Sequence, residues 1–294
     1  MMKKYISLIL IFTLSLFIFS CTKKEDIKKE VQKQLNITIL LDLSDRIDPK
    51  VDNVSPSHSQ RDIEIVKTIT EIFKSEMKKT GTVLCNGKIK IIFIPQPQDE
   101  NINSIAKDLN IDLSVKNIKD KKEIYETITD KFVTSLNKIY NDTLKTKQWL
   151  GSDIWRFFKN DVKDYATDEK YRNILVILTD GYIYHKDSTN RQNNRYAYIL
   201  PKLFEEYKLR KNSRWQEILE KQNFGLITKR NDLQDLEILV LEVTPSSKNK
   251  DDEDIIKHIL SKWFEEMGVK KYSIYNTDLP EYTKKRIKDF FIGE

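Results

Sequence analysis

The sequence predicts an α/β protein with a doubly wound, mostly parallel sheet that carries helices on both faces. Four apolar runs of strand length support this, at residues 36–43, 88–94, 173–179 and 236–243. Apolar runs of this kind, bounded by polar residues, are typical of strands buried on both faces. Segments with the apolar spacing of helices lie between the runs, and this alternation indicates a parallel sheet covered on both sides.

The expected helices follow from periodicity and from their end signals. They cover residues 62–79, 120–140, 153–165, 251–267 and a last segment that begins at Asp278 and Pro280. Asp120, with Glu123 three residues on, resembles a capping box. The acidic run 251–254 favours a helix start, where the backbone dipole stabilises negative charge. Two weaker apolar runs, 111–115 and 271–275, are expected to be further strands.

A long segment interrupts the alternation of strands and helices. Residues 182–235 separate two expected strands by far more than one crossover helix needs. Two short helices are expected inside it, at 197–211 and at 213–222, the second capped by Ser213 and Gln216. Because the segment leaves the sheet directly after Asp180, we expect this insertion to lie at the edge of the sheet.

The amino terminus has the features of an export signal. Two lysines precede a 15-residue apolar run, Tyr5–Phe19, which is short for a membrane span but right for a signal-peptide core. The following Ile-Phe-Ser-Cys resembles a bacterial lipobox, which implies lipidation at Cys21; an uncleaved anchor helix is the alternative. We therefore expect a signal peptide over 1–20, a charged tether over 21–35 and a domain over 36–294. Such a protein is lipid-anchored in the bacterial cell envelope and faces the periplasm or the exterior.

Composition excludes some functions. The formal charge of +6 falls to +4 without Lys3 and Lys4, since 49 basic residues then face 45 acidic ones. The surplus is spread along the chain, and no basic block alternates with aromatics as a nucleic-acid groove would require. Cys85 is the second of two cysteines, so no disulfide is expected once Cys21 is lipidated, and Cys85 is expected to be small and buried.

Polar side chains follow two of the expected strands directly. Asp42 and Ser44 come after the first strand, and Asp180 comes after the run 173–179. The carboxyl ends of parallel strands lie at one edge of an open α/β sheet, where ligands are commonly bound. These three side chains are therefore predicted to lie close together.

The order of elements and these polar residues resemble a von Willebrand factor type A (VWA) domain, over about residues 36 to 292. This resemblance implies a Rossmann-like sheet and a divalent-cation site, the metal-ion-dependent adhesion site, whose first motif is Asp-x-Ser-x-Ser. Asp42 and Ser44 match its first two positions, Ser152 stands where the family has a Thr, and Asp180 matches the distal Asp. The implied ligand is Mg²⁺ or Mn²⁺, since hard cations take oxygen ligands and leave a position for a partner's carboxylate.

Arg46 departs from this motif, because it stands where the family has its second Ser. A guanidinium cannot coordinate a cation and carries its own charge. Three arrangements are open. Arg46 turns outward while water replaces the hydroxyl, or it bridges Asp42 and Asp180 as an internal ion pair, or it presents its charge to an acidic ligand in place of the metal.

The resemblance implies a non-enzymatic domain that binds a protein or an envelope polymer. The insertion is expected to set partner specificity through six side chains: Tyr182, Tyr184, Arg191, Arg195, Tyr196 and Tyr198. Two alternatives remain. Asp42 and Asp180, with Asp45, are suited to a metal-dependent phosphoester hydrolase, although Ser44 stands where such enzymes need a second Asp. The second alternative is a structural envelope subunit whose cation site no longer binds metal.

Overall fold

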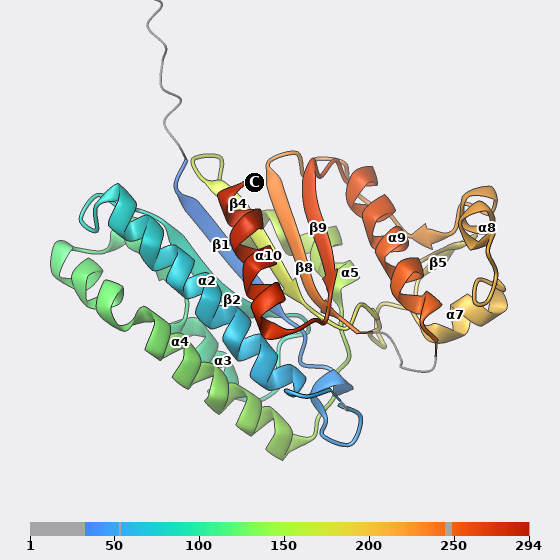
Figure 1. Ribbon diagram of the computed structural model, residues 1–294, viewed down its shortest axis with the longest axis horizontal. Helices are drawn as coiled ribbons and strands as arrows, with labels where there is room; N and C mark the ends of the chain where they lie inside the picture. Colours follow the sequence, from blue (N-terminus) through green and yellow to red (C-terminus); the bar gives the residue numbers. More distant parts are fainter. Residues whose placement is uncertain (1–32, 53, 245–248, 294) are drawn as a thin grey trace, which may run out of the picture. The chain divides into compact units, whose positions relative to one another are not determined.

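A six-stranded sheet forms the centre of the computed structural model, which describes residues 33–52, 54–244 and 249–293 (Figure 1). The expected signal peptide, Cys21 and the expected tether as far as residue 32 lie outside these residues. The strand order is β3-β2-β1-β4-β8-β9, and the strands are β1 Leu35–Leu41, β2 Lys88–Phe93, β3 Ile111–Asp112, β4 Arg172–Leu178, β8 Leu236–Val243 and β9 Lys271–Asn276. All neighbours pair in parallel except β3, which is antiparallel to β2. The predicted doubly wound α/β class is confirmed.

Helices cover both faces of this sheet, because successive side chains of a buried strand point to opposite faces. Ile37, Ile39 and Leu41 of β1 pack into a core with the long helices α2 (His58–Thr80) and α4 (Ile118–Thr146), with the short α3 (Glu100–Asp108), and with α10 (Pro280–Ile292). Leu40 of the same strand belongs to the core on the other face. Each face therefore has its own apolar core.

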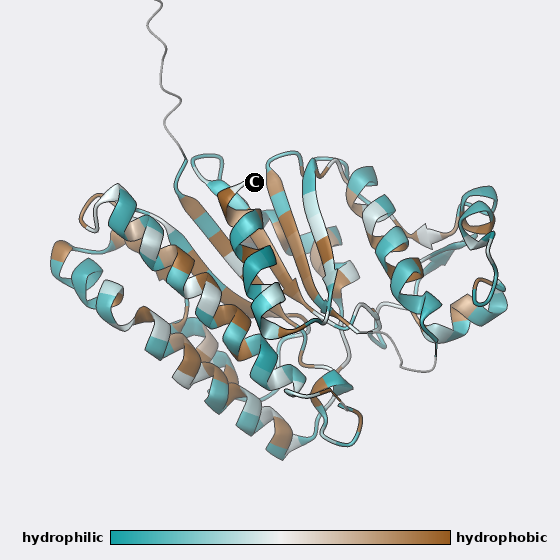
Figure 2. Cartoon of the chain, in the orientation of Figure 1, coloured by the Kyte–Doolittle hydropathy of each residue, from teal (hydrophilic) through white to brown (hydrophobic). Residues whose placement is uncertain are grey.

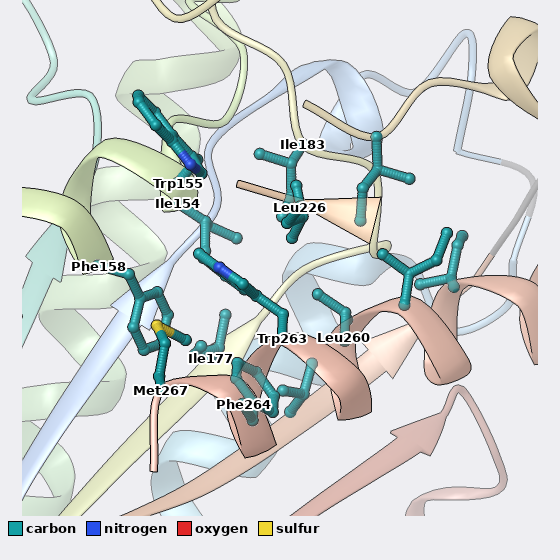
Figure 3. Packing of buried hydrophobic residues seen from close by; sticks show 14 of the residues in the cluster. Ile154, Trp155, Phe158, Ile177, Ile183, Leu226, Leu260, Trp263, Phe264 and Met267 are labelled. Atoms are coloured by element: carbon teal, nitrogen blue, oxygen red, sulfur yellow. The ribbon is translucent and has the colours of Figure 1, made fainter. Parts of the chain in front are cut away.

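The second core is rich in aromatic side chains (Figure 3). Trp263 and Phe264 of α9 (Asp251–Glu266) pack against Phe158, with ring centroids 4.8 and 5.7 Å from that of Phe158. Phe158 belongs to an irregular helical segment made of α5 (Ile154–Arg156), a π-helical turn (Phe157–Asp161) and α6 (Val162–Ala166). The single helix expected at 153–165 is thus broken by a π turn.

The segment between β4 and β8 forms a small substructure on this second face. It contains a three-stranded sheet of β5 (Arg191–Gln192), β6 (Arg195–Tyr196) and β7 (Gly225–Leu226), with helices α7 (Pro201–Glu206) and α8 (Trp215–Lys221). The expected helix over 197–211 was too long. The expected cap at Ser213 was wrong, because α8 begins after Arg214 with no side-chain cap.

Other local expectations were corrected by side-chain hydrogen bonds. The helix expected to begin at Asp120 begins at Ile118, because the side chain of Asn117 caps the amide of Asp120. The strand expected over 111–115 stops at Asp112, whose carboxylate accepts from the amide of Ser114 and starts a 3-10 turn. Cys85 is buried, as expected. Within the described part of the chain, no helix has both the length and the apolarity to span a membrane.

Candidate functional site

Asp42 links the ends of the two central strands. It follows β1 and is 2% exposed. Its Oδ1 accepts a hydrogen bond from the amide of Ser44 (2.9 Å), and its Oδ2 accepts one from the hydroxyl of Thr179 (2.8 Å), directly after β4. Both carboxylate oxygens of Asp42 are therefore held by neighbours, and the loops that follow the two strands are fixed to each other.

Ser152 is brought to the same edge by a tight backbone contact. Its amide donates to the carbonyl of Tyr184 at 2.7 Å. The preceding Gly151 has φ +80°, and a Cβ there would lie 2.3 Å from that carbonyl oxygen, so only glycine fits. The Oγ of Ser152 is buried and has no hydrogen-bond partner. A buried polar atom without a partner calls for an explanation, such as an ion or a water at the site.

Asp180 is the second carboxylate of the site. Its Oδ1 accepts from the amide of Tyr182 at 2.9 Å. Burial and the neighbouring charge of Asp42 raise the pKa of Asp180 to about 7. The structure thus brings Asp42, Ser44, Ser152 and Asp180 to one edge of the sheet.

A cavity of about 470 Å³ lies at this edge of the sheet. Ser44, Ser152 and Asp180 line it, whereas Asp42 lies behind the lining. Among the described residues, no three His, Cys, Asp or Glu side chains form a cluster that could hold a metal. The donors at the cavity are hydroxyl and carboxylate oxygens, and this set fits Mg²⁺ or Mn²⁺, which prefer oxygen ligands and of which Mg²⁺ keeps several waters.

Arg46 takes neither the outward arrangement nor the Asp42–Asp180 bridge, although it is one of the residues that line the cavity. Its side chain is 1% exposed and forms an ion pair, by a short contact, with Asp62 of α2. The Nε of Arg46 also donates to the backbone carbonyl of Asp42 (2.9 Å), and the hydroxyl of Tyr140, on α4, donates to Asp62 at 2.5 Å. Arg46 therefore lies between the first strand and two helices, neither exposed nor bridging Asp42 and Asp180.

Burial and charge act against each other in this group. Burial lowers the pKa of Arg46, but the charge of Asp62, the neighbouring Tyr140 and Asp42 and the hydrogen bond to Asp62 together outweigh it, so the pKa of Arg46 is raised. Burial raises the pKa of the Asp62 carboxyl, and Arg46 offsets this only in part. The pKa of Tyr140 is also raised, by burial and by the charge of Asp62. Arg46 stays charged and Tyr140 stays protonated.

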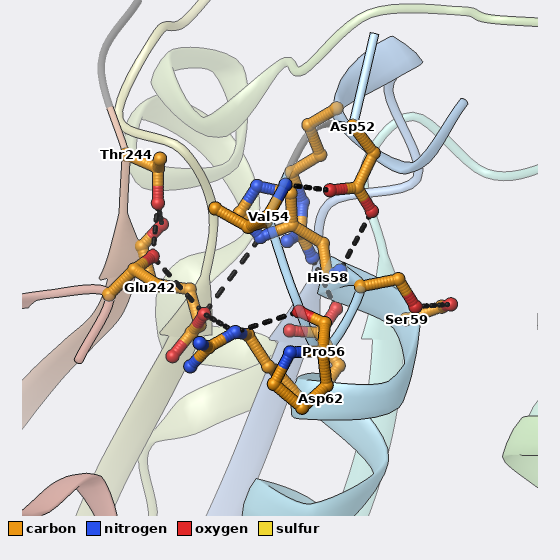
Figure 4. A network of polar contacts seen from close by, with 12 residues as sticks. Asp52, Val54, Pro56, His58, Ser59, Asp62, Glu242 and Thr244 are labelled. Atoms are coloured by element: carbon orange, nitrogen blue, oxygen red, sulfur yellow. Dashed lines mark hydrogen bonds and ion pairs between the residues drawn. The ribbon is translucent and has the colours of Figure 1, made fainter. Parts of the chain in front are cut away.

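A second polar group lies beside the site, around Glu242 near the end of β8 (Figure 4). Glu242 is 1% exposed, with its Oε2 3.8 Å from Nδ1 of His58 and 4.0 Å from Nε of Arg61. The amide of His58 also donates to Asp52 at 2.8 Å. These contacts connect the loop before α2 to β8, and so fix one wall of the cavity.

Sequence reasoning missed four residues of this edge, namely Thr179, Asp62, Tyr140 and Glu242. Two carried a signal: Thr179 directly precedes Asp180, and Glu242 interrupts an otherwise apolar strand. Asp62 and Tyr140 carried none, because their contact with Arg46 depends on how two helices pack on the sheet.

The insertion residues expected to bind a partner divide into two groups. Tyr196 is 2% exposed, and its hydroxyl lies 2.9 Å from that of Tyr207. Arg195 makes two 2.7 Å hydrogen bonds to the carboxylate of Glu266, on α9. Tyr196 and Arg195 therefore hold the small sheet together, and Tyr196 is buried rather than displayed to a partner.

The other residues of this set are more accessible. Tyr182 and Tyr184 line the cavity beside Asp180, and Tyr184 is 43% exposed. Tyr182 donates from its hydroxyl to Asp252 at 2.9 Å, and Tyr198 packs edge-on against Tyr184. Arg191 is exposed and lies over the ring of Tyr196. Two tyrosines of the insertion thus form part of the wall of the candidate site.

Among the solved structures similar to this chain are two crystal structures of the pilus adhesin SpaC from Lactobacillus rhamnosus GG. One has a TM-score of 0.41 and 11% identity, and covers 90% of this chain and 31% of the adhesin. The other, in an open conformation, has a TM-score of 0.36 and 12% identity, and the match covers 89% of this chain and 31% of the adhesin. The chain spans less than a third of the length of these adhesins. No protein-family model and no curated protein sequence matches the chain.

Proposed function

We propose that this chain is a VWA-like binding protein, held in the bacterial cell envelope by a lipid anchor at Cys21. Its domain binds a protein or an envelope polymer through Mg²⁺ or Mn²⁺ at the carboxyl end of the sheet. The observation that carries this proposal is the buried, unpartnered Oγ of Ser152, which lines one cavity with Ser44 and Asp180.

The donors of the site define how a cation would act there. Ser44, Ser152 and Asp180 would hold it, and Asp42 would orient Ser44 from behind through its bond to that residue's amide. A hard cation held by few protein charges keeps exchangeable positions and attracts an anionic group of a partner. Tyr182 and Tyr184, on the wall of the same cavity, would then contact the partner beside the ion.

The contacts of Asp42 weigh against a hydrolase. A nucleophile or a general base needs a lone pair directed at the substrate. Both oxygens of Asp42 accept hydrogen bonds from within the protein, and Asp42 does not line the cavity. Asp45 does line it, but it is exposed and belongs to a short 3-10 turn. A binding role is therefore preferred over catalysis.

The test is thermal unfolding of a form beginning at residue 24, first in chelator and then with excess Mg²⁺ or Mn²⁺. Binding to the folded state at about 100 times the dissociation constant adds roughly 2.7 kcal/mol to its stability. We expect the midpoint to rise, and Ser152→Ala to abolish the rise. Ser188→Ala, at another buried serine of the described chain, is the matched control and should keep it.

An unchanged midpoint in the unaltered protein would contradict a cation site and favour the structural-subunit alternative, in which partner binding does not depend on metal. The anchor has a separate test. Cys21→Ser should release the protein from the membrane fraction, and unchanged retention would contradict lipidation at this cysteine.

A further inference from the structure

The end of the domain opposite the candidate site is formed by three short segments. They are residues 33–35, the loop 81–87 that follows α2, and the stretch 113–119 that leads into α4; together we call them the N-terminal edge. The side chain of Gln34 donates to the carbonyl of Leu84 (3.5 Å) and accepts from the amide of Asn86 (2.5 Å). The first described residues of the domain therefore lie directly beside the 81–87 loop.

This edge exposes large apolar side chains. Val83, Leu84, Val115 and Ile118 are 43%, 70%, 76% and 55% exposed. Figure 2 shows hydrophobic colour at the turn after α2 and at the start of α4. Single exposed apolar residues are ordinary, but several together mark an interaction surface.

Hydrogen bonds hold the two apolar segments together. The amide of Leu113 donates to the carbonyl of Gly87 at 3.0 Å. The buried ammonium of Lys121 donates to the carbonyl of Val83 and to the side chain of Asn86, both at 3.0 Å. The exposed side chains are therefore presented by one fixed surface rather than by two independent loops.

Basic side chains accompany the apolar ones. Six lysines are exposed on or beside this edge, against four carboxylates beside it, which leaves a net charge of +2: Lys33, Lys78, Lys79, Lys116, Lys119 and Lys122 against Glu76, Asp112, Asp120 and Glu123. Apolar side chains with lysines around them are typical of proteins that bind an anionic lipid surface, because the apolar groups enter the interface while the lysines meet the headgroups.

We propose that the N-terminal edge is a docking surface for an anionic lipid membrane. Two observations select a membrane over a protein partner. The exposed groups combine apolar and basic character, and the residues before Lys33, which carry the lipid anchor in the function proposed above, join the domain at this same edge. The proposal goes beyond the binding function above and does not rest on the cation site.

Hydrogen–deuterium exchange of the full chain on vesicles tests this surface. The vesicles contain phosphatidylcholine alone or with an equal part of phosphatidylglycerol. We expect slower exchange in the peptides covering 81–87 and 113–119 on the anionic vesicles only. The peptide covering 276–280, at the opposite end of the sheet, should exchange at the same rate on both.

A charge-reversal variant with a matched control shows whether the lysines are responsible for the protection on anionic vesicles. Near an anionic surface each lysine contributes about a fivefold change in partition, or about 1 kcal/mol. Replacing Lys116, Lys119 and Lys122 by Glu should therefore return exchange to the rate on phosphatidylcholine. The control replaces Lys131, Lys138 and Lys145, exposed on the same helix away from its start, and should keep the protection.

Four results would overturn the proposal. A chain that stays off anionic vesicles does not dock through this edge. Equal exchange on both kinds of vesicle, or protection that survives the charge reversal, rules out headgroup recognition. Protection that rises with protein density regardless of lipid would instead assign the edge to a second copy of the chain.

Discussion

The buried pair of Arg46 and Asp62 gives the sharpest prediction about stability. The two side chains are 1% and 0% exposed and lie under the candidate site. Removing one partner of a buried pair leaves an uncompensated charge, which costs about 3–5 kcal/mol. We therefore expect Arg46→Met and Asp62→Leu each to lower the free energy of unfolding by about that amount.

The double variant should be far more stable than the sum of the single changes implies. Replacing both charges by apolar groups is often close to neutral, so the main loss is the hydrogen bond from Tyr140 to Asp62. A buried hydroxyl left without its partner costs about 1–3 kcal/mol. The singles sum to about 6–10 kcal/mol and the double costs about 1–3 kcal/mol, so the coupling is at least about 3 kcal/mol.

Urea unfolding of the four proteins measures this cycle, provided that the m-values agree. The control cycle uses Lys163 and Asp232, an exposed pair with N–O distance 3.0 Å, whose coupling should not exceed about 1 kcal/mol. The assignment of Arg46 and Asp62 as a coupled ion pair would be refuted if the unfolding free-energy changes of the two single variants summed, within about 0.5 kcal/mol, to that of the double variant. Arg46→Ser, which restores the Asp-x-Ser-x-Ser motif, should be destabilising for the same reason, because it leaves the buried charge of Asp62 without a partner. Adding Asp62→Asn should relieve this loss.

Three further predictions follow from other contacts. Burial raises the pKa of Glu237, but its basic partners Arg172 and Lys271 outweigh burial and lower that pKa below 4.5. Ionised Glu237 therefore stabilises the folded state above pH 4.5, and this contribution is lost as the pH falls through the lowered pKa. Glu237→Gln should therefore reduce the loss of unfolding free energy at acid pH, measured by urea unfolding over a series of pH values. An equal loss in the variant and in the unaltered protein would disprove this. Gly151→Ala should cost more than Gly81→Ala in thermal unfolding, by about 1–3 kcal/mol, because both have positive φ but only the first meets a backbone oxygen at 2.3 Å. Asp252→Ala removes the carboxylate that pairs with Arg210 at 2.6 Å and should speed proteolysis within residues 186–222. Equal cleavage rates in the variant and the unaltered protein would show that this contact does not hold the insertion.

Much of the sheet was predictable because parallel strands buried on both faces are almost wholly apolar. The four predicted main strands differ from the observed ones by at most two residues at either end. The insertion was less predictable, because strands of two residues are too short to show a period. The helix α3 was missed for a related reason: Ile102 is its one buried side chain among the residues described there.

The site was predictable where chemistry follows a strand end, and not where it depends on helix packing. Asp42 and Asp180 directly follow apolar runs, so parallel pairing alone places them together. Ser152 was found through the resemblance to a family motif. The position of Arg46 could not be predicted, because its partner Asp62 is defined by the rotation of α2 against the sheet.

The first strand also fixes the relation between the two proposed surfaces. β1 begins at Leu35, beside the N-terminal edge, and ends at Leu41, directly before Asp42. Its seven residues span about 23 Å at roughly 3.3 Å per residue. Because β1 and β4 run in parallel, the loops that line the cavity lie at the far end from the N-terminal edge. A membrane docked at that edge therefore leaves the cavity open to a partner on the other side. Since the two surfaces share no residue, Ser152→Ala should weaken cation binding without changing membrane docking, and charge reversal at Lys116, Lys119 and Lys122 should do the opposite.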